Sequence, residues 1–320
     1  MNDLLKIGER PPADYQKPLV SICCLAYNHQ DFIRDCFEGF LKQKTTFPVE
    51  ILVHDDASTD STAQLIRGYQ EEYPLLVKPI YQRINQFSRG VKINWQFNYP
   101  RAKGKYIAIC EGDDFWVDPS KLERQVRFLE ENPEYVIVYG DAQAFDEKGL
   151  LDVDFGGARR DLSALELQKG TPIFTLTVLF RNVLEAMPPE FNLAPYGDRA
   201  MWSLLGLNGK GHYLRDLKPC MYRVHDGGIH SKRSEIIRAR MNQRTAFALM
   251  VFFERIGVHE VAKFYENRAY DGWRKSLGVD FRLFPLMRGL TKALSWLRTA
   301  YRGVGSALGW VFRAGNKRAH

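Results

Sequence analysis

Short apolar segments alternate with amphipathic segments between residues 18 and 140, and this alternation constrains the fold more than any other feature of the sequence. Leu19–Ala26 (LVSICCLA) is an almost uninterrupted apolar run of strand length, as expected for a strand buried on both faces. Over Phe32–Leu41, apolar residues recur at helical spacing along one stripe. Strands joined by helices of this length predict an α/β fold, with a mostly parallel sheet flanked by helices.

The pattern continues along the chain and gives further elements. Strands are predicted over Val49–His54, Leu75–Tyr81, Tyr106–Cys110 and Tyr135–Tyr139. Helices are predicted over Ser61–Tyr73 and Lys121–Glu131, with a helical start at residues 91–103 that breaks at Pro100. Residues 141–170 are polar and Gly-rich and predict a loop region. The last part of the fold is predicted to hold an apolar run at Ile173–Phe180, a helix from Asp198, a strand near Tyr213–Tyr222 and helix from Ser234 to Leu277.

These elements divide the chain into three regions. Residues 1–17 are polar, contain two prolines and are expected to form an N-terminal arm. Residues 18–233 form the α/β domain, with halves at 18–140 and 141–233. Residues 234–320 form a helical C-terminal extension that ends in a basic amphipathic tail over residues 281–320.

Charge is unevenly distributed along the sequence. The net charge is +7, but residues 281–320 hold eight Arg or Lys and no Asp or Glu, which leaves −1 (7 − 8) for the rest. A near-neutral body argues against nucleic acid as a partner, whereas a basic, aromatic-rich tail favours an anionic surface such as the inner leaflet of a membrane. No apolar run reaches the length of a membrane-spanning helix, and the N-terminus has no signal-peptide core, so a cytoplasmic protein is expected. Five cysteines without a CxxC pair predict reduced thiols and no zinc site.

Acidic residues directly follow two of the predicted strands. Asp55 and Asp56 come after the strand VEILVH, and Glu111, Asp113 and Asp114 come after the strand YIAIC. Because ligands of open parallel sheets bind beyond the carboxyl ends of the strands, both clusters are expected at one ligand-binding edge. Carboxylates crowded there repel one another unless a cation or a polar ligand compensates. Turns rich in Asp and Ser also end strands for purely structural reasons, but two at one edge favour a functional site.

Three segments together resemble the family 2 glycosyltransferases, which have the GT-A fold, a Rossmann-like α/β architecture. These are Pro18–Asn28 (PLVSICCLAYN), Asp55–Thr62 (DDASTDST) and Glu111–Trp116 (EGDDFW). The stretch Ala102–Val126 resembles the donor-binding core of the bacterial surface-polysaccharide members. The resemblance covers about residues 18–230 and implies a donor half at 18–140 and an acceptor half at 141–233.

The resemblance implies roles for the donor-side residues. Ala26, Tyr27 and Asn28 match the loop that packs on the nucleotide, although Tyr27 is also suited simply to fill the core. Asp56 matches the carboxylate that contacts the uracil ring of a UDP-sugar, with Asp55 in support. Glu111 stands in the leading position of the family's DxD-type motif, where another acid is more usual.

The resemblance also implies a divalent cation, Mn²⁺ or Mg²⁺, at this edge. Asp113 matches a metal ligand, and Asp114 is either a second ligand or a supporting acid. His225 matches a downstream histidine that completes the metal shell in some members, and a structural role is equally open. Arg223 is a candidate for neutralising the donor's diphosphate. Oxygen ligands favour Mg²⁺ or Mn²⁺ over Zn²⁺.

Asp198 in the segment YGDRAMW resembles the family's acceptor-side acid, which implies a general base for an inverting transfer; capping of the helix that it opens is the alternative. The expected function is therefore transfer of a sugar to a glycan or lipid-linked acceptor in cell-surface polysaccharide synthesis. A sugar nucleotidyltransferase and a non-catalytic carbohydrate-binding scaffold at the membrane remain alternatives. The former usually has a Gly-rich and basic phosphate loop near the N-terminus, and Leu25–Gln30 has none.

The basic tail predicts attachment to the cytoplasmic face of the membrane. The segment 281–313 combines apolar and aromatic residues with six Arg or Lys, as helices that lie in the membrane interface do. Deleting residues 281–320 should move the protein from the membrane fraction to the soluble fraction, as measured by fractionation of cell lysates. An unchanged distribution would show that the basic residues form only a solvated face.

Overall fold

The computed structural model describes residues 4–11, 15, 17–227 and 234–276. Its contacts divide the chain into two units, residues 1–276 and residues 277–320, and all described residues belong to the first. The tail predicted over residues 281–320 therefore lies outside the described residues.

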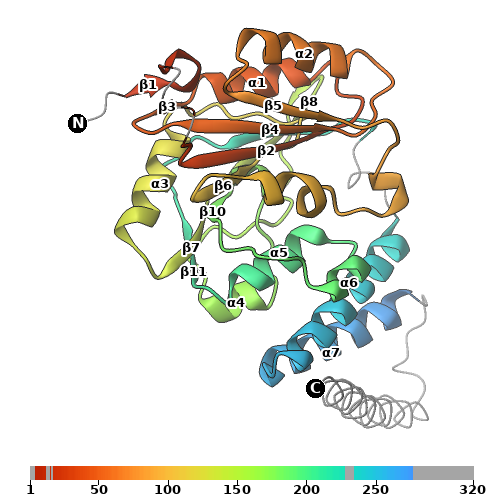
Figure 1. The fold of residues 1–320 in the computed structure, drawn as a ribbon. Helices are drawn as coiled ribbons and strands as arrows, with labels where there is room; N and C mark the ends of the chain where they lie inside the picture. The colour runs from red at the N-terminus through yellow and green to blue at the C-terminus, as the bar shows by residue number, and fades with distance from the viewer. Residues whose placement is uncertain (1–3, 12–14, 16, 228–233, 277–320) are drawn as a thin grey trace, which may run out of the picture. The chain divides into compact units, whose positions relative to one another are not determined.

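A seven-stranded sheet forms the centre of the first unit (Figure 1). The strand order is β11-β7-β10-β6-β2-β4-β5, and every pairing is parallel except the two made by β10. The mostly parallel sheet that the sequence predicts is thus confirmed. The strands are β2 (Val20–Ala26), β4 (Val49–Asp55), β5 (Val77–Tyr81), β6 (Tyr106–Ile109), β7 (Tyr135–Tyr139), β10 (Leu179–Arg181) and β11 (Lys210–Tyr213).

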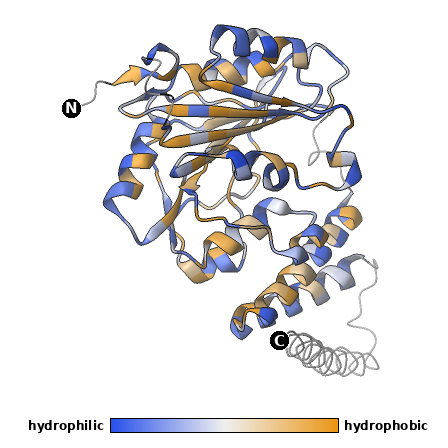
Figure 2. Ribbon diagram, in the orientation of Figure 1, coloured by the Kyte–Doolittle hydropathy of each residue, from blue (hydrophilic) through white to orange (hydrophobic). Residues whose placement is uncertain are grey.

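Helices cover both faces of this sheet. The helices α1 (Ile33–Leu41), α2 (Thr62–Glu72) and α3 (Lys121–Glu131) contribute to one hydrophobic core, and α4 (Ala164–Gln168) and α5 (Gly197–Leu205) contribute to the other. Strand β2 serves both cores, because Ile22 and Cys24 pack into the first while Cys23 packs into the second with Trp202. Side chains therefore point into a core on both faces, which explains why strands such as β2 are almost continuously apolar (Figure 2).

The break predicted at Pro100 is present. A turn of π-helix, η4 (Asn94–Asn98), leads into the 3₁₀ turn η5 (Tyr99–Arg101). Proline lacks the N–H that a continuing helix needs, so the chain changes its helical geometry at this point. The other short turns are η1 (Ile7–Glu9), η3 (Phe87–Arg89), η6 (Thr175–Thr177) and η7 (Pro189–Leu193).

The loop region predicted over residues 141–170 is wrong in part. A second sheet with the order β12-β8-β9 uses β8 (Ala142–Asp146) and β9 (Gly149–Leu150) together with β12 (Cys220–Arg223). Only Ala144 of β8 is fully buried, so this strand lacks the apolar run that reveals the central strands. The single strand predicted near Tyr213–Tyr222 is also two strands, β11 in the large sheet and β12 in the small one.

At both described ends of the first unit, the chain packs against the α/β domain. Near the N-terminus, β1 (Leu5–Lys6) pairs with β3 (Lys44–Thr45), and Ile7 is fully buried. At the other end, the predicted helical region consists of α6 (Glu235–Arg255) and α7 (His259–Ser276). These two helices share an apolar core with α5. None of the helices in the described part of the chain is long and apolar enough to cross a membrane.

Two helical glycines give opposite expectations for stability. A methyl group on Gly39 of α1 would lie 2.8 Å from the backbone oxygen of Trp116, whereas one on Gly68 of α2 would meet no heavy atom within 4 Å. We expect Gly68→Ala to raise the free energy of unfolding by about 1 kcal/mol, since alanine is the better helix former. Gly39→Ala should lower it by about 1–3 kcal/mol because the backbones must move apart. Urea denaturation measures both, and a gain from both substitutions would contradict the close approach.

Candidate active site

Three segments of the chain leave the large sheet at the carboxyl ends of three neighbouring strands, and this end of the sheet is the edge meant below. Strands β2 and β4 are parallel with Ala26 opposite Asp55, and β2 and β6 are parallel with Cys23 opposite Ile109. The segments that follow these three strands therefore emerge side by side. They carry the Ala26–Asn28 loop, the Asp55–Asp56 pair and the acidic segment 111–114.

The loop after β2 is tied to the loop after β4. The backbone N–H of Asn28 donates to Ser58 Oγ at 2.9 Å, and Thr59 N–H donates to the side-chain oxygen of Asn28 at 2.8 Å. Asn28 has a φ of +55°, a left-handed conformation that asparagine tolerates better than most residues. The buried Ala26 accepts a backbone bond from Asp56, while Tyr27 is 44% exposed at the rim.

The two acids at the carboxyl end of β4 differ in their partners. The carboxylate of Asp56 accepts the backbone N–H groups of Gln86 at 2.7 Å and Phe87 at 2.9 Å, so it holds the turn that begins η3. Asp55 receives only a long bond of 3.4 Å from Ser58 N–H. Its other oxygen is buried and has no hydrogen-bond partner among the described residues. Burial accordingly raises the pKa of Asp55.

A glycine allows the acidic segment after β6 to pass close to the first loop. A Cβ on Gly112 would lie 2.8 Å from Ile33 Cδ1 and 2.9 Å from His29 Nδ1. The Gly112 N–H donates to the carbonyl of Leu25 at 2.8 Å, which continues the contact between β6 and β2. Glycine at this position brings the next residue, Asp113, beside His29.

Asp113 lies between two histidines. Its Oδ2 is 3.1 Å from His225 Nε2 and 3.8 Å from His29 Nε2. Burial alone would raise the pKa of Asp113, but the hydrogen bond with His225 and the field of His29 lower it below its usual value. The ring of His225 also packs on Phe32, with centroids 4.7 Å apart. The carboxylate and the imidazole are thus in direct hydrogen-bond contact, close enough for both to bind one ligand.

Asp114 and Arg223 fasten this loop to the small sheet. Asp114 is 4% exposed and accepts the backbone N–H of Arg223 at 2.8 Å. Burial raises the pKa of Asp114 well above its usual value, and the neighbouring acids add to this effect. The Arg223 side chain donates through Nε to the Asp113 carbonyl and through Nη2 to Asp35 on α1, at 2.8 and 2.7 Å. Its guanidinium also lies over the rings of Phe32, Phe115 and Phe145, and these contacts help to fix the loop in place.

The acid Glu111 is affected by the charge of Asp198 from a different part of the chain. Burial raises the pKa of Glu111 to about 7, and the charges of Asp113 and Asp198 contribute to this rise. The side chain of Asp198, in the first turn of α5, makes no hydrogen bond or ion pair with another described residue. Tyr196 occupies the N-cap position of α5, so the alternative in which Asp198 caps the helix is not observed.

Three residues near the site were not selected from the sequence. His29 directly follows the Ala26–Asn28 loop, and this position was the available signal. Lys92 donates to the carbonyl of Ala194, and its pKa is lowered by burial and by Arg244 against the opposing charge of Asp198. Asp35 is the partner of Arg223. Lys92 and Asp35 carry no local sequence signal, since Asp35 is an ordinary polar residue of α1 and Lys92 lies in the segment that leads into η4.

The residues present fit a divalent cation only as a partial shell. Among the described residues, no group of three or more His, Cys, Asp or Glu side chains is arranged to hold a metal ion. Asp113 and His225 supply two donors that already face each other. Mg²⁺ is commonly bound by one or two carboxylates together with the phosphates of a substrate. The donor set therefore fits a cation that arrives with a diphosphate.

Comparison with known families decides the classification. A sequence model described as Glycosyl transferase family 2 matches residues 21–186, which include both acidic segments. The chain belongs to glycosyl transferase family 2. The resemblance noted in the sequence is thereby confirmed, and the GT-A fold agrees with solved structures. The structure of TarS from S. aureus in complex with UDP-GlcNAc has a TM-score of 0.58 and 19% identity, over 84% of this chain and 76% of that one.

Two bacterial proteins are similar to this chain in sequence. The chain is 40% identical over 214 residues to the uncharacterized protein Rv1520 of Mycobacterium tuberculosis, which is 66% of this chain and 60% of that protein. The match thus spans less than two thirds of that relative's length. The chain is also 28% identical over 224 residues, 69% of this chain and 83% of the relative, to an Escherichia coli protein. That protein is the UDP-Glc:alpha-D-GlcNAc-diphosphoundecaprenol beta-1,3-glucosyltransferase WfaP.

The raised pKa of Glu111 predicts a pH-dependent stability. Between about pH 4.5 and 7 the unfolded chain releases this proton while the folded protein keeps it. The folded state then binds more protons, so the free energy of unfolding falls as the pH rises through this window. Glu111→Gln should remove that part of the slope, as measured by urea denaturation of the metal-free protein at a series of pH values. Parallel curves for the two proteins would show that Glu111 titrates normally.

Proposed function

We propose that this family 2 glycosyltransferase transfers a sugar from a UDP-sugar to a hydroxyl group of a glycan or lipid-linked acceptor in cell-surface polysaccharide synthesis. One observation carries the proposal: the acids that follow β4 and β6 emerge at the same edge of the sheet. The charge of Asp198 on Glu111 agrees with this arrangement. The UDP-sugar in the names of WfaP and of the TarS complex supports the choice of donor. The diphosphate-linked lipid in the name of WfaP supports an acceptor of that class.

The donor half, residues 18–140, is proposed to bind the nucleotide. Ala26, Tyr27 and Asn28 form one wall for the uridine, and the Asp55–Asp56 pair accepts hydrogen bonds from its base. The buried, unpartnered oxygen of Asp55 supports this assignment, because a donor from the ligand would satisfy it. Glu111 is proposed to accept from the ribose.

The diphosphate is proposed to lie beside Asp113. Asp113 and His225 would hold Mn²⁺ or Mg²⁺, with Asp114 behind them, and the cation would offset the charge that develops on the departing diphosphate. Arg223 adds positive charge at this point. Because its side chain already holds the Asp113 loop and Asp35, we assign it to positioning that loop. The low pKa of Asp113 supports its role, since the group is kept ionised and ready to bind a cation.

Asp198, from the acceptor half at residues 141–233, is proposed as the general base. Its carboxylate takes the proton of the acceptor hydroxyl while that oxygen attacks the anomeric carbon, and the bond from this carbon to the diphosphate oxygen breaks. A single displacement of this kind inverts the anomeric centre and requires no enzyme nucleophile. The absence of a hydrogen-bond partner for Asp198 among the described residues supports the role. The tail at residues 281–320 is proposed to keep the enzyme on the cytoplasmic face of the inner membrane, where a lipid-linked acceptor is found.

Product analysis tests the proposed reaction. The full-length protein is incubated with Mn²⁺ and a panel of nucleotide-sugars, with and without a lipid-diphosphate-linked sugar, and the released nucleotide is identified. Release of UDP with a glycosylated acceptor supports the proposal. Release of pyrophosphate would instead indicate a nucleotidyltransferase, and no binding or turnover of any donor would indicate a non-catalytic scaffold.

Asp198→Asn should separate donor binding from transfer. The amide cannot accept the proton, so we expect kcat to fall by about a hundredfold to ten-thousandfold with donor affinity retained. Steady-state kinetics and calorimetric titration of UDP measure the two quantities. Glu71→Gln, an acid-to-amide change on the exposed side of α2, is the matched control and should behave as wild type. Normal turnover by Asp198→Asn would exclude this residue as the base.

Asp113→Ala, unlike Asp198→Asn, should impair donor binding itself. Loss of the carboxylate removes one of two facing donors, so UDP binding should no longer strengthen when Mn²⁺ is added. Titrations of UDP with Mn²⁺ and with a chelator measure the effect, with Asp198→Asn as the comparison that keeps it. A variant whose UDP affinity still depends fully on Mn²⁺ would contradict the assignment.

A further inference from the structure

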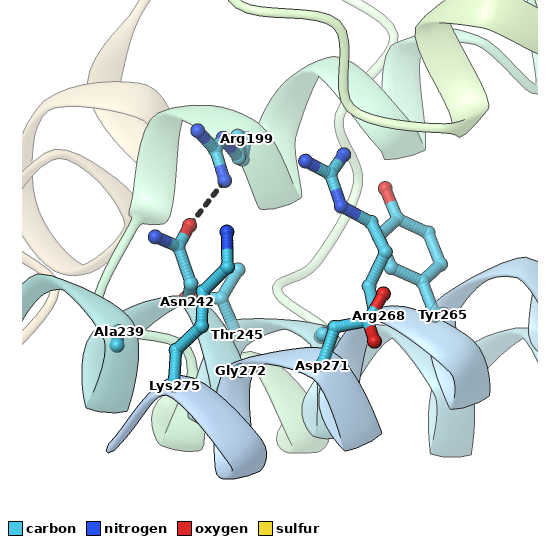
Figure 3. Close-up of a pocket in the computed structure, with 10 residues that line it drawn as sticks. Arg199, Ala239, Asn242, Thr245, Tyr265, Arg268, Asp271, Gly272 and Lys275 are labelled. Carbon is cyan, nitrogen blue, oxygen red and sulfur yellow. Dashed lines mark hydrogen bonds between the residues drawn. The ribbon is translucent and has the colours of Figure 1, made fainter. Parts of the chain in front are cut away.

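A cavity lies between α5, α6 and α7. Its volume is about 220 Å³. Figure 3 shows Arg199 from α5 and Arg268 and Lys275 from α7 extending into the same space, above a floor that includes Asn242 and Thr245 of α6. Three cations thus line one cavity from two different helices.

The cations that line this cavity outnumber its acids by three to one. Asp271 is the one acid among the residues that line it, and its carboxylate is 3.8 Å from Arg274, which does not line it. Arg199, Arg268 and Lys275 form no ion pair with a carboxylate in the described part of the chain. Burial and the nearby charge of Arg199 lower the pKa of Arg268, and the opposing charge of Asp271 offsets this only in part. An anion would relieve this repulsion.

The cavity is built by groups that have other contacts to keep them in place. Arg199 donates to the side-chain oxygen of Asn242, which orients its guanidinium (Figure 3). At the floor, Tyr196 N–H donates to Thr245 Oγ1 at 3.1 Å. A Cβ on Gly272 would lie 3.0 Å from the backbone of Gln243, so this glycine allows α6 and α7 to pack closely beneath the cavity. A preformed wall of this kind reduces the ordering that a ligand must impose on binding.

The place of the cavity connects it to the transfer reaction. Arg199 directly follows Asp198 in the first turn of α5, and successive residues of an α-helix point about 100° apart. The same turn therefore presents the proposed base on one side and a cation of the cavity on the other. A molecule that contacts both must carry an anionic group a short distance from its reacting hydroxyl.

The C-terminal tail is a poor occupant on grounds of charge. Residues 281–320 contain eight Arg or Lys and no acid, so the tail would add positive charge to a positive cavity. A small anion with several acceptor oxygens fits better, because guanidinium groups bind phosphate oxygens through paired hydrogen bonds.

We propose that the cavity between α5, α6 and α7 binds the phosphate or diphosphate group of the acceptor substrate and so places its hydroxyl beside Asp198. This inference rests on the proposed function for the identity of the acceptor, whereas the anion site itself does not depend on it. Donor and acceptor then each have their own anion site, and Asp198 directly precedes Arg199 of the acceptor's anion site on α5.

The anion site is tested first with inorganic pyrophosphate. Calorimetric titrations use the full-length protein with its donor site saturated by UDP and Mn²⁺. The double variant Arg268→Gln/Lys275→Gln removes two of the three cations and should bind pyrophosphate at least about tenfold more weakly than wild type. Lys263→Gln, on the same helix but outside the cavity, is the matched control and should keep wild-type affinity. Equal affinity of all three proteins would overturn the proposal.

A second measurement identifies the source of the anion. A soluble sugar-diphosphate with a short isoprenoid chain is titrated against the same proteins, and vesicles with and without phosphatidylglycerol are tested for sedimentation with them. Tighter binding of the sugar-diphosphate than of pyrophosphate, lost in the double variant, supports the acceptor site. Loss of vesicle binding alone would assign the cavity to a lipid headgroup and overturn the acceptor assignment. If UDP does not bind but pyrophosphate binding is lost in the double variant, the anion site stands and the proposed function fails.

Discussion

Crowded negative charge at one edge of the sheet is the constraint on which the rest of this structure depends. The parallel register of β2, β4 and β6 brings the acids that follow β4 and β6 to the same edge. The surroundings of each acid then compensate its charge in a different way. Asp56 accepts hydrogen bonds from backbone N–H groups, and Asp113 is hydrogen-bonded to a histidine. Burial raises the pKa of Glu111 and Asp114, which favours their neutral, protonated forms. A cationic ligand at this edge would favour the ionised state of the whole group.

Most strands of the central sheet could be predicted because they are buried on both faces, whereas β10 was visible only as part of an apolar run. Runs such as VSICCLA and YVIVY are too apolar and too short to be anything else between amphipathic helices, and their bounds agree with the structure to within a residue or two. The small sheet escaped prediction, since β8 buries one residue and pairs with β12, more than seventy residues later in the chain. Pairing between distant half-exposed strands leaves no local periodic signal.

The same limit applies to the site. The acids were found because strand ends and sequence resemblance mark them, and their placement at one edge follows from parallel register alone. What the sequence could not supply are contacts between remote segments: Arg223 with Asp35, Lys92 with Ala194, and the cavity formed by α5, α6 and α7. Arg199 was visible only as the neighbour of Asp198, and nothing in its surroundings along the chain indicates that Arg268 and Lys275 lie beside it.

Arg223 has a consequence for how this chain can vary. It connects β12 to the Asp113 loop and to α1 with two hydrogen bonds in different directions, and it stacks on aromatic rings from three separate segments. A lysine keeps the charge but has a single ammonium group and no flat face, so it cannot make these contacts together. An exchange that substitution tables treat as mild would therefore be among the more disruptive ones available here, and drift at this position should be slow even where the surrounding loops diverge.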